Sequence, residues 1–439
     1  MKKFMRLIFL GHCSFYTISN FAKAIKQNLK NVTITVADPV KPNGDELTEE
    51  DEKVFDEIIK LPSKRNIKLT CSNRIASIKD IVKDKNKMKY FLKCFFLLRW
   101  NSVKNYINGN AKNYIYSILI SKQLENYDVY HFHYLAPEFL APLKFIKKDK
   151  RVLLTLWGSD LYQVEGVGNY IKQLEAFKRS DIITINTAEM KETFLTKFGR
   201  MLEPKIRYAD FGLNEKKLDL INTKNNQQTI SDFKKKNNIA EDKIVVVIGY
   251  SGSSKQRHIE ILRILDKLDK NILRKFFAII PMTYGLQFED KNYLQKVKNE
   301  CNKVRFDYKI ITEFMPQEDL IGLIISGQIK LNLRETDAVN AAMLESLFAG
   351  SIVVNGSWLP YGKLRRLKIY FEEVDSLDDL TNLIPYLIEN FKHVKNRTIN
   401  NPSLISKNFS YSSAINDWIK VYNEINTNKN KFKIVPEIT

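Results

Sequence analysis

Short apolar runs alternate with helical stretches along the first half of this chain. Phe4–Gly11 is the first run, Ile18–Leu29 has a helical pattern, and Val32–Val36 is the next run. The order strand, loop, helix, strand predicts a parallel α/β sheet. Further strands of this half are expected at Val129–Tyr134, Val152–Leu156, Ile182–Ile185 and Ile206–Tyr208.

The same rhythm starts again in the second half, after a polar stretch at 214–242 that contains few apolar residues and is predicted to connect two domains. Strands are then expected at Ile244–Gly249, Phe276–Ile280, Val304–Ile311, Ile329–Leu333 and Ser351–Asn355. The doubled pattern predicts an α/β fold of two Rossmann-like domains facing each other across a cleft. In such sheets, ligands bind beyond the carboxyl ends of the strands, so the loops there are the places to search for chemistry.

Composition adds a strong positive charge to this picture. The 439 residues include 44% hydrophobic residues, enough for two ordinary folded domains, and the net charge is +20. Between Lys60 and Lys122 there are 15 Lys or Arg but only two acidic residues, Asp80 and Asp84. A basic surface attracts nucleic acid, anionic lipid or a phosphorylated substrate. A generally Lys-rich and Asn-rich composition is the plainer explanation of the overall charge.

Cysteine usage and hydropathy indicate a cytoplasmic protein. The four cysteines contain no C-x-x-C pair, and their spacing suits neither a zinc site nor a disulfide framework, so we expect free thiols in a reducing compartment. These are Cys13, Cys71, Cys94 and Cys301. The basic and apolar start has no small-residue cleavage site, and no apolar stretch is long enough to span a bilayer.

Two acidic residues, Asp337 and Glu345, lie eight positions apart between two expected strands. On one helix they would be about 12 Å apart, too far to hold one small group together. We therefore expect Asp337 in the loop and Glu345 in the helix, with the N–H groups near Asn340 and Ala341 directed at an anion. Glu345 can accept both hydroxyls of a ribose. A nucleotide sugar fits this pattern, although an ordinary helix capped by Asp337 is the alternative.

A second candidate is the loop after the strand at 244–249, which reads GYSGSSKQRH. Small residues such as Ser251 and Gly252 allow backbone N–H groups to approach a phosphate, while Lys255 and Arg257 supply positive charge. The loop is therefore predicted to bind a phosphate group. The alternative is a solvated turn before a helix.

A third candidate is TLWGSD, residues 155–160, after a strand of the first domain. A transfer that inverts the sugar needs a base to deprotonate the acceptor, and Asp160 is the first candidate for it, followed by His133 and His12. Asp160 could equally be a turn residue. The alternation of a strand puts His131 and His133 on one face, where a structural role and a substrate contact are both open. No carboxylate or cysteine stands at metal-ligand spacing beside them, so no metal is expected.

These motifs resemble those of family 4 (group 1) glycosyltransferases of the GT-B type. The D-x7-E segment resembles their E-x7-E motif, with Ala338-Val339-Asn340-Ala341 in place of the usual glycine-rich loop. The loop at 249–258 is also similar to that of Fuc4NAc transferases, and Trp157 stands where family 4 enzymes carry a His. The helix beginning FSYSSAINDW resembles their last helix, which often crosses back to the first domain.

The resemblance implies four parts of the chain. Residues 1–213 would form the acceptor-side Rossmann-like domain with a basic helical insert at 41–125, and 214–242 the linker. Residues 243–407 would bind the nucleotide sugar, and 408–439 would form the helix that crosses back. The resemblance further implies that Lys255 and Arg257 bind the diphosphate and that Asp337 lies at the hexose.

We therefore expect a metal-independent glycosyltransferase that needs no cofactor and transfers a sugar from a nucleotide-sugar donor to a surface-glycan or lipid-linked acceptor. A non-hydrolysing nucleotide-sugar epimerase on the same fold is one alternative. A polyanion-binding or nucleic-acid-binding protein is another, but the basic block lacks regular aromatic–basic interleaving, so nucleic acid is not the expected partner.

The segment Lys79–Lys104 combines aromatic residues with lysines and is too short and too charged to span a bilayer. It suits a helix that lies in an anionic membrane surface, where a lipid-linked acceptor would be found, so the protein is expected to be cytoplasmic and peripheral to the membrane. A core helix with solvated lysines is the alternative.

Overall fold

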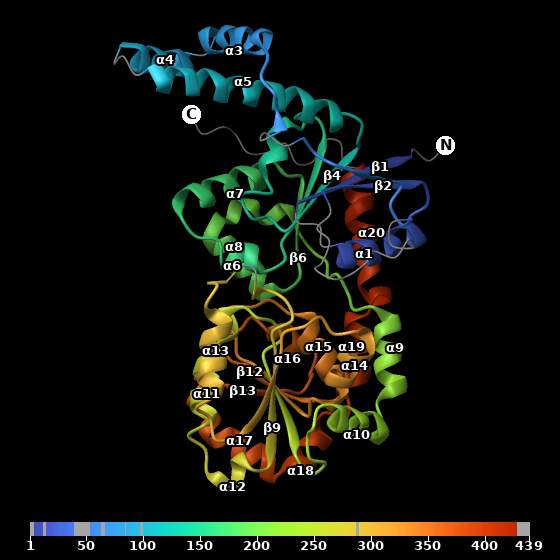
Figure 1. Ribbon diagram of the computed structural model, residues 1–439. Helices are drawn as coiled ribbons and strands as arrows, with labels where there is room; N and C mark the ends of the chain where they lie inside the picture. The colour runs from blue at the N-terminus through green and yellow to red at the C-terminus, as the bar shows by residue number, and fades with distance from the viewer. Residues whose placement is uncertain are drawn as a thin grey trace. The chain divides into compact units, whose positions relative to one another are not determined.

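The computed structural model describes residues 4–11, 15–38, 53–62, 66–83, 85–96, 100–286 and 289–427. Its strands form two parallel sheets of seven and six strands, with helices on both, which confirms the predicted α/β fold class (Figure 1). By the density of internal contacts the chain divides into two units. The first unit comprises 1–155, 167–181 and 424–439, and the second comprises 156–166 and 182–423.

The first sheet has the strand order β3-β2-β1-β4-β5-β6-β7. Its strands are β1 (Met5–Gly11), β2 (Val32–Ala37), β3 (Glu57–Ile59), β4 (Val129–His133), β5 (Arg151–Thr155), β6 (Ile182–Ile185) and β7 (Ile206–Tyr208). The central strands are apolar runs because a parallel sheet is covered on both faces, and residues 7–10 of β1 are fully buried. The sequence did not predict β3, a short edge strand whose residues are mostly exposed.

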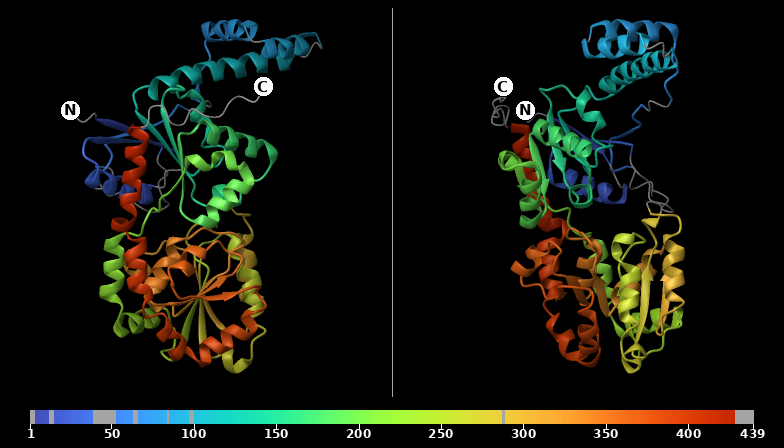
Figure 2. Two further views of the ribbon diagram at one scale, coloured as in Figure 1. Left: turned by 180° about the vertical axis from the view of Figure 1, so that it is seen from behind. Right: turned by 90° about the vertical axis from the view of Figure 1, so that its left-hand side faces the viewer.

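Helices connect these strands, and the described part of the basic insert is mainly helical, as expected (Figures 1 and 2). The helices of this half are α1 (Phe15–Asn28), α3 (Cys71–Lys83), α4 (Lys85–Phe96), α5 (Trp100–Gln123), η2 (Ala141–Phe145), α6 (Ser159–Tyr162), α7 (Val167–Arg179), α8 (Ala188–Phe198) and η3 (Arg200–Lys205). No described helix is long and apolar enough to cross a membrane.

The second sheet has the strand order β10-β9-β8-β11-β12-β13. Its strands are β8 (Ile244–Ile248), β9 (Phe276–Pro281), β10 (Asp307–Ile311), β11 (Ile329–Asn332), β12 (Ile352–Gly356) and β13 (Glu372–Val374). The expected strands are all present, and the missed one, β13, is again a three-residue edge strand. The central pair, β8 and β11, ends at the loops that carry the candidate donor residues.

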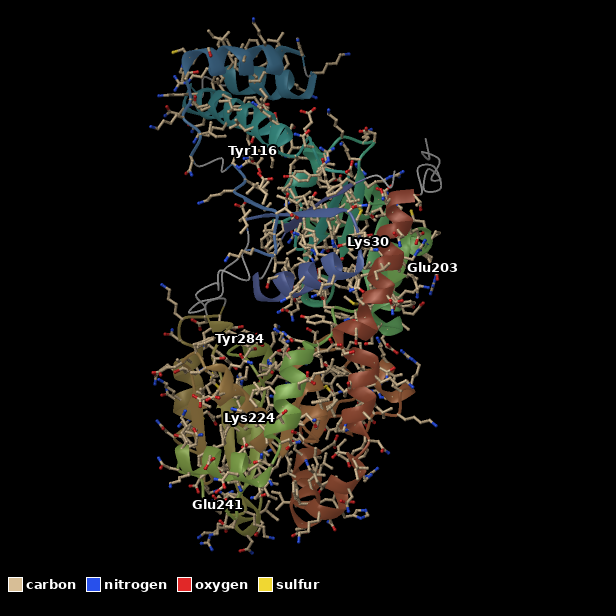
Figure 3. The ribbon with its side chains drawn as sticks, turned by 90° about the vertical axis from the view of Figure 1, so that its right-hand side faces the viewer. Lys30, Tyr116, Glu203, Lys224, Glu241 and Tyr284 are labelled. Atoms are coloured by element: carbon tan, nitrogen blue, oxygen red, sulfur yellow. The ribbon has the colours of Figure 1, made fainter. Side chains whose placement is uncertain are left out.

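The helices of the second half are α9 (Glu215–Lys224), α10 (Gln227–Lys236), η4 (Ser254–Gln256), α11 (His258–Leu265), α12 (Lys270–Leu273), α13 (Tyr293–Cys301), α14 (Gln317–Ser326), α15 (Ala341–Phe348), α16 (Gly362–Arg366), α17 (Leu380–Glu389), α18 (Phe391–Arg397) and α19 (Asn401–Phe409). The polar stretch at 214–242 thus forms two helices, which pack against α14 (Figure 3 labels Lys224 on α9). Its few apolar residues are buried in two separate clusters, Leu218 and Ile221 in one and Phe233 in the other, and each cluster includes residues of α14.

The last helix, α20 (Tyr411–Thr427), packs against the segment that precedes α9. The indole N–H of Trp418 donates to the carbonyl of Asp210 at 2.6 Å, and the Trp418 ring lies 5.6 Å from the ring of Phe211. Leu213 and Ser410 form a β-bridge. Residues 210–213 and 410–418 are therefore held together although they are about 200 positions apart in the sequence.

Candidate donor site at the carboxyl edge of the second sheet

The loop after β8 begins with a glycine that no other residue could replace without movement. Gly249 has a φ of +66°, and a Cβ there would lie 2.9 Å from Oε1 of Gln256 and 3.1 Å from Nε2 of His258. The buried hydroxyl of Ser251 accepts a hydrogen bond from the Gln256 amide at 2.9 Å. The backbone N–H of Gly252 donates to the carbonyl of Tyr284 at 2.7 Å. These contacts fix the path of the loop.

The two cations of this loop are each in contact with one partner. Lys255 makes a 2.6 Å ion pair with Glu335, and both side chains are 46% exposed. Arg257 has left-handed backbone angles, and its guanidinium lies 5.7 Å from the ring centroid of Trp358. A half-exposed ion pair is worth about 1 kcal/mol or less, so Lys255 can exchange its carboxylate partner for another anion.

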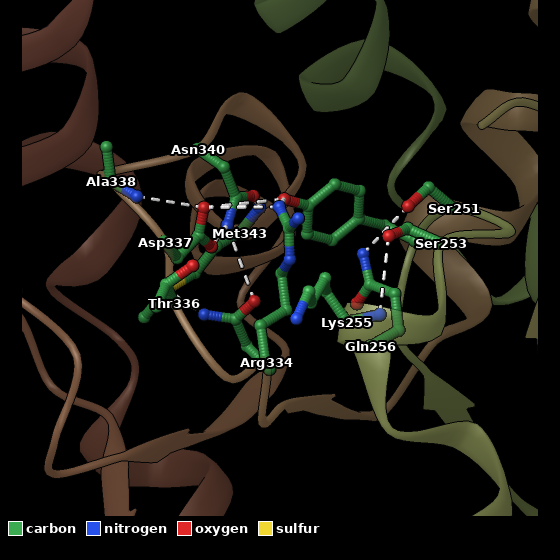
Figure 4. A network of polar contacts seen from close by, with 12 residues as sticks. Ser251, Ser253, Lys255, Gln256, Arg334, Thr336, Asp337, Ala338, Asn340 and Met343 are labelled. Carbon is green, nitrogen blue, oxygen red and sulfur yellow. Dashed lines mark hydrogen bonds and ion pairs between the residues drawn. The ribbon is translucent and has the colours of Figure 1, made fainter. Parts of the chain in front are cut away.

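Asp337 lies in the loop between β11 and α15, at the centre of a hydrogen-bonded network (Figure 4). Its Oδ2 accepts from the Asn340 amide at 2.6 Å and from the Tyr361 hydroxyl at 2.9 Å, and its Oδ1 accepts from the Ala338 N–H at 2.9 Å. Asn340 also caps α15, because its side-chain oxygen accepts from Met343 N–H at 2.7 Å. The network orients the start of the helix that contains Glu345.

Arg334 is the counter-ion of Asp337 in this network. Its guanidinium lies 3.4 Å from the Asp337 carboxylate and donates a hydrogen bond to the Tyr250 hydroxyl. Burial raises the pKa of Asp337, while Arg334 and the hydrogen bonds from Asn340 and Tyr361 oppose the rise. Burial likewise raises the pKa of Tyr250 well above its usual value. The loops after β8 and β11 therefore meet through Tyr250, Arg334 and Asp337.

Glu345 lies within α15 and is paired with a residue that sequence reasoning did not single out. Its carboxylate is 2.7 Å from Nζ of Lys217 on α9, and the two side chains are only 11% and 16% exposed. Ala341 is the first residue of the same helix. Lys217 was missed because it lies in the polar stretch that was interpreted as a connection.

Lys330 on β11 is a second cation that the sequence did not reveal. It is buried and donates to the carbonyl of Gly249 at 2.7 Å, so it holds the first residue of the loop after β8 in place. Burial lowers the pKa of Lys330 to about 7, and the negative charge of Glu345 opposes this shift. Within an apolar-looking strand, IKLN, the lysine itself was the only available signal.

Asp160 is fully buried at the start of the short helix α6. Its Oδ1 accepts from the backbone N–H of Trp157 at 2.9 Å and from that of Gly158 at 2.8 Å. Gly158 has a φ of +119°, and a Cβ there would lie 2.7 Å from the Cβ of Ala338. This loop and the loop of Asp337 therefore approach each other within the second unit.

His131 and His133 lie side by side on β4, both fully buried, with ring centroids 3.8 Å apart. Nε2 of His131 is 2.6 Å from the Thr155 hydroxyl. Burial lowers the pKa of His133 to about 3 and that of His131 well below its usual value, so both are neutral at pH 7. His12 lies outside the described residues.

Metal-ligating side chains do not gather anywhere in the described ranges: among these residues no group of three His, Cys, Asp or Glu could hold a metal ion. The described cysteines, Cys71 and Cys301, are free thiols. At the candidate donor site, positive charge is present on the side chains of Lys255, Arg257 and Arg334.

Comparison with known proteins identifies the architecture. No protein-family model matches the chain, and no curated protein sequence matches it. Anabaena HepE in complex with UDP-glucose matches with 11% identity and a TM-score of 0.66, covering 95% of this chain and 100% of the other. A glycosyltransferase from Rickettsia africae matches with 15% identity and a TM-score of 0.66, covering 98% and 100%. WaaG, a glycosyltransferase involved in lipopolysaccharide biosynthesis, matches with 12% identity and a TM-score of 0.61, covering 96% and 100%.

The chain has the GT-B fold. Coverage of nearly the whole chain means that both sheets take part in the match. In this GT-B chain the loops after β8 and β11 stand at the carboxyl edge of the second sheet, where open α/β sheets bind ligands.

Proposed function

We propose that the protein is a glycosyltransferase that transfers a sugar from a nucleotide-sugar donor without a metal ion. The observation that carries the proposal is the joined pair of loops after β8 and β11. These loops hold three cations, Lys255, Arg257 and Arg334, and two acidic side chains, Glu335 and Asp337. The GT-B fold supports it, since HepE was solved with UDP-glucose in that fold.

Donor binding is divided among the residues of these two loops. Lys255 and Arg257 bind the diphosphate together with the backbone around Ser251 and Gly252, because each lies on the loop directly after β8. Glu345 accepts the ribose hydroxyls, and Lys217 holds its carboxylate in place. Asp337 stands beside the hexose, where its carboxylate, held by Asn340 and Tyr361, can accept a hydrogen bond from a sugar hydroxyl.

Catalysis in this proposal rests mainly on placement and on stabilisation of the leaving diphosphate. The N-terminus of α15, capped by Asn340, adds the positive end of a helix dipole to the charges of Lys255 and Arg257. Fixed charges of this kind need no reorganisation during the reaction and can replace a metal ion. Asp160 is the candidate base, with His133 and His12 behind it, for a transfer that inverts the sugar.

The acceptor in this proposal is a surface glycan or a lipid-linked saccharide, and the enzyme works in the cytoplasm, peripheral to an anionic membrane. WaaG supports a surface-glycan acceptor, because it acts in lipopolysaccharide biosynthesis and has the same fold. The basic helical insert of the first unit supports the membrane location.

A panel of nucleotides and nucleotide sugars tests the donor part of the proposal. One nucleotide should raise the melting temperature of the protein, and its sugar conjugate should be consumed in the presence of acceptor extracts. Activity should persist in excess EDTA. Loss of activity with chelator and its return with Mg²⁺ or Mn²⁺ would contradict the metal-independent site, and turnover of the donor to a second nucleotide sugar without acceptor would indicate an epimerase.

A further inference from the structure

The helical insert of the first unit ends in an exposed aromatic cluster that no neighbouring element covers among the described residues. The rings of Phe91 and Phe95 are 6.4 Å apart, and those of Phe95 and Trp100 are 5.4 Å apart in an edge-on arrangement. Phe96 touches Phe95 with ring centroids 6.0 Å apart. Phe96 is 76% exposed, Trp100 59% and Phe95 42%, although aromatic side chains of this size are normally buried. We call Phe91, Phe95, Phe96 and Trp100 the aromatic tip.

The insert is a small bundle with a core of its own, so the exposure of the aromatic tip is not a failure to pack. Helices α3 and α4 both lie against α5, and Ile81, Val103 and Ala111 are buried between them. At the other end of α5, Tyr116 stacks edge-on with Phe145 at 5.4 Å and fixes the helix to the rest of its unit (Tyr116 is labelled in Figure 3). The aromatic tip lies where α4 ends and α5 begins, at the opposite end of α5 (Figures 1 and 2).

Basic residues run along α4 directly beside its apolar residues. Lys85, Lys89 and Lys93 follow one another at four-residue steps and therefore form one row on the helix, and all three are exposed. Leu92 and Phe96 form the adjacent row and are also exposed. An apolar row beside a lysine row is the pattern of a helix that binds at the surface of an anionic bilayer.

The helical part of the insert, from α3 to α5, carries a strong positive charge. Residues 71–123 contain eleven Lys or Arg and only two acidic residues, Asp80 and Asp84. Helix α3 adds a second exposed apolar row, at helical spacing, made of Ile75, Ile78 and Val82. Aliphatic side chains suit hydrocarbon but cannot stack on nucleobases, so these rows favour a lipid surface over a single-stranded nucleic acid.

We infer that the aromatic tip is a wedge that inserts into an anionic bilayer while Lys85, Lys89 and Lys93 bind the lipid headgroups. This deepens the proposed function and rests on it in one respect, namely that a lipid-linked acceptor is the reason for membrane binding. The sequence predicted one helix lying flat over Lys79–Lys104, whereas the structure divides this segment among α3, α4 and α5, and places the largest exposed side chains at the junction of α4 and α5. Aromatic residues partition to the interface between headgroups and hydrocarbon, which is the depth that such a wedge reaches.

Sedimentation of the full-length protein with vesicles tests the wedge. Vesicles of phosphatidylcholine with about one-third phosphatidylglycerol should bind the protein at low salt, and pure phosphatidylcholine vesicles should not. The double variant Phe96→Ser/Trp100→Ser should bind the anionic vesicles at least about tenfold more weakly than the wild type. The reason is that each ring removed from the bilayer loses its apolar transfer energy. The matched control is Val167→Ser/Ile399→Ser, which removes two equally exposed apolar side chains elsewhere and should bind as the wild type does.

A charge-reversal pair tests the headgroup contacts. Lys85→Glu/Lys89→Glu/Lys93→Glu should abolish binding to anionic vesicles, whereas Lys270→Glu/Lys291→Glu/Lys298→Glu, which makes the same change in charge on exposed residues of the second unit, should retain most of it. Brominated lipids should quench the fluorescence of the wild type more than that of Trp100→Phe, which reports insertion of that ring directly.

Three results would overturn the inference: equal binding by the tip and control variants, equal binding to neutral vesicles, or no extra quenching through Trp100. A change from dimer to monomer in the tip variant, with no vesicle binding by the wild type, would assign the aromatic tip to self-association, and binding of single-stranded RNA in place of vesicles would assign it to nucleic acid. Titration of each variant with the same panel of nucleotides by calorimetry separates this inference from the proposed function. Vesicle binding without any nucleotide binding would leave the wedge intact and remove the transferase.

Discussion

The loops after β8 and β11 and the loops after β4 and β5 all stand at the carboxyl edge of a parallel sheet, yet they hold their polar side chains in opposite ways. In the first pair, side chains bind other side chains, as in the contacts of Asp337 with Arg334 and of Lys255 with Glu335. After β5, Asp160 binds backbone N–H groups of its own turn, and His133, the last residue of β4, is buried with a pKa of about 3. The comparison shows that the cations of the candidate donor loops are held by side chains that an anion could replace, whereas Asp160 and His133 are enclosed by the protein.

The largest effect should come from breaking the buried charge pair of the donor loops. Arg334→Leu should lower the free energy of unfolding by about 3 kcal/mol, because Asp337 then keeps a buried carboxylate without its counter-ion. Lys255→Met, which breaks a half-exposed pair on the neighbouring loop, should cost about 1 kcal/mol or less. Urea unfolding of both variants measures the contrast, and equal losses would show that the two pairs do not differ as their burial implies.

The next largest effect is expected on turnover, from a change to the buried carboxylate of Asp160. Asp160→Asn should fold normally, since the amide oxygen can accept the same two backbone N–H groups, and should leave nucleotide affinity nearly intact. Turnover should fall by about 10²-fold or more, the usual scale for the loss of a general base. Steady-state kinetics and calorimetry on the same preparation separate these effects. Turnover near that of the wild type would assign Asp160 to the turn alone.

A change at Glu345 tests whether the candidate donor site binds a nucleotide. Glu345→Ala should weaken nucleotide binding by roughly 1–3 kcal/mol, because two hydroxyls would lose a charged acceptor. Lys217→Met keeps that acceptor and removes only its partner, so its effect should be smaller. Calorimetric titration of both variants decides the matter, and a nucleotide affinity unchanged by Glu345→Ala would remove the central argument for the donor site.

The smallest effect concerns the paired histidines. An imidazole whose pKa falls from 6.5 to about 3 on folding takes up its proton only when the chain unfolds, so stability falls as the pH drops from 6.5 towards 3. Between pH 7 and 5.5, the wild type should lose about 1 kcal/mol more than His133→Gln. Urea unfolding at the two pH values measures this, and parallel pH profiles would show that His133 titrates alike in both states.

The periodicity of apolar residues was enough to predict the central strands and the α/β class, because buried parallel strands are continuous apolar runs. It failed for β3 and β13, because each is a strand of only three residues at a sheet edge, too short to show a hydrophobic period. It also failed to show the helices at 215–236, where only a few residues such as Leu218 and Phe233 face the core.

Candidate site residues could be predicted only where the chemistry lies within one short segment. Asp337, Asn340 and Glu345 are close in sequence and were found together. Lys217 reaches Glu345 from 128 positions away, and Tyr361 reaches Asp337 from 24 positions away, so only the fold brings them together. Arg334 lies only three residues before Asp337, close enough in sequence to be recognised as its counter-ion, yet the sequence analysis did not assign it to the site.

The bond from Trp418 to Asp210 and the bridge between Leu213 and Ser410 have a consequence for gene shuffling. Recombination of related genes works best when each crossover leaves contacting residues on the same parental fragment. A single crossover between positions 213 and 410 would separate both contacts, so chimaeras made there would inherit mismatched partners. Two crossovers, placed so that the segments around 210–213 and 410–418 come from the same parent, would exchange the loops after β8 and β11 as one cassette.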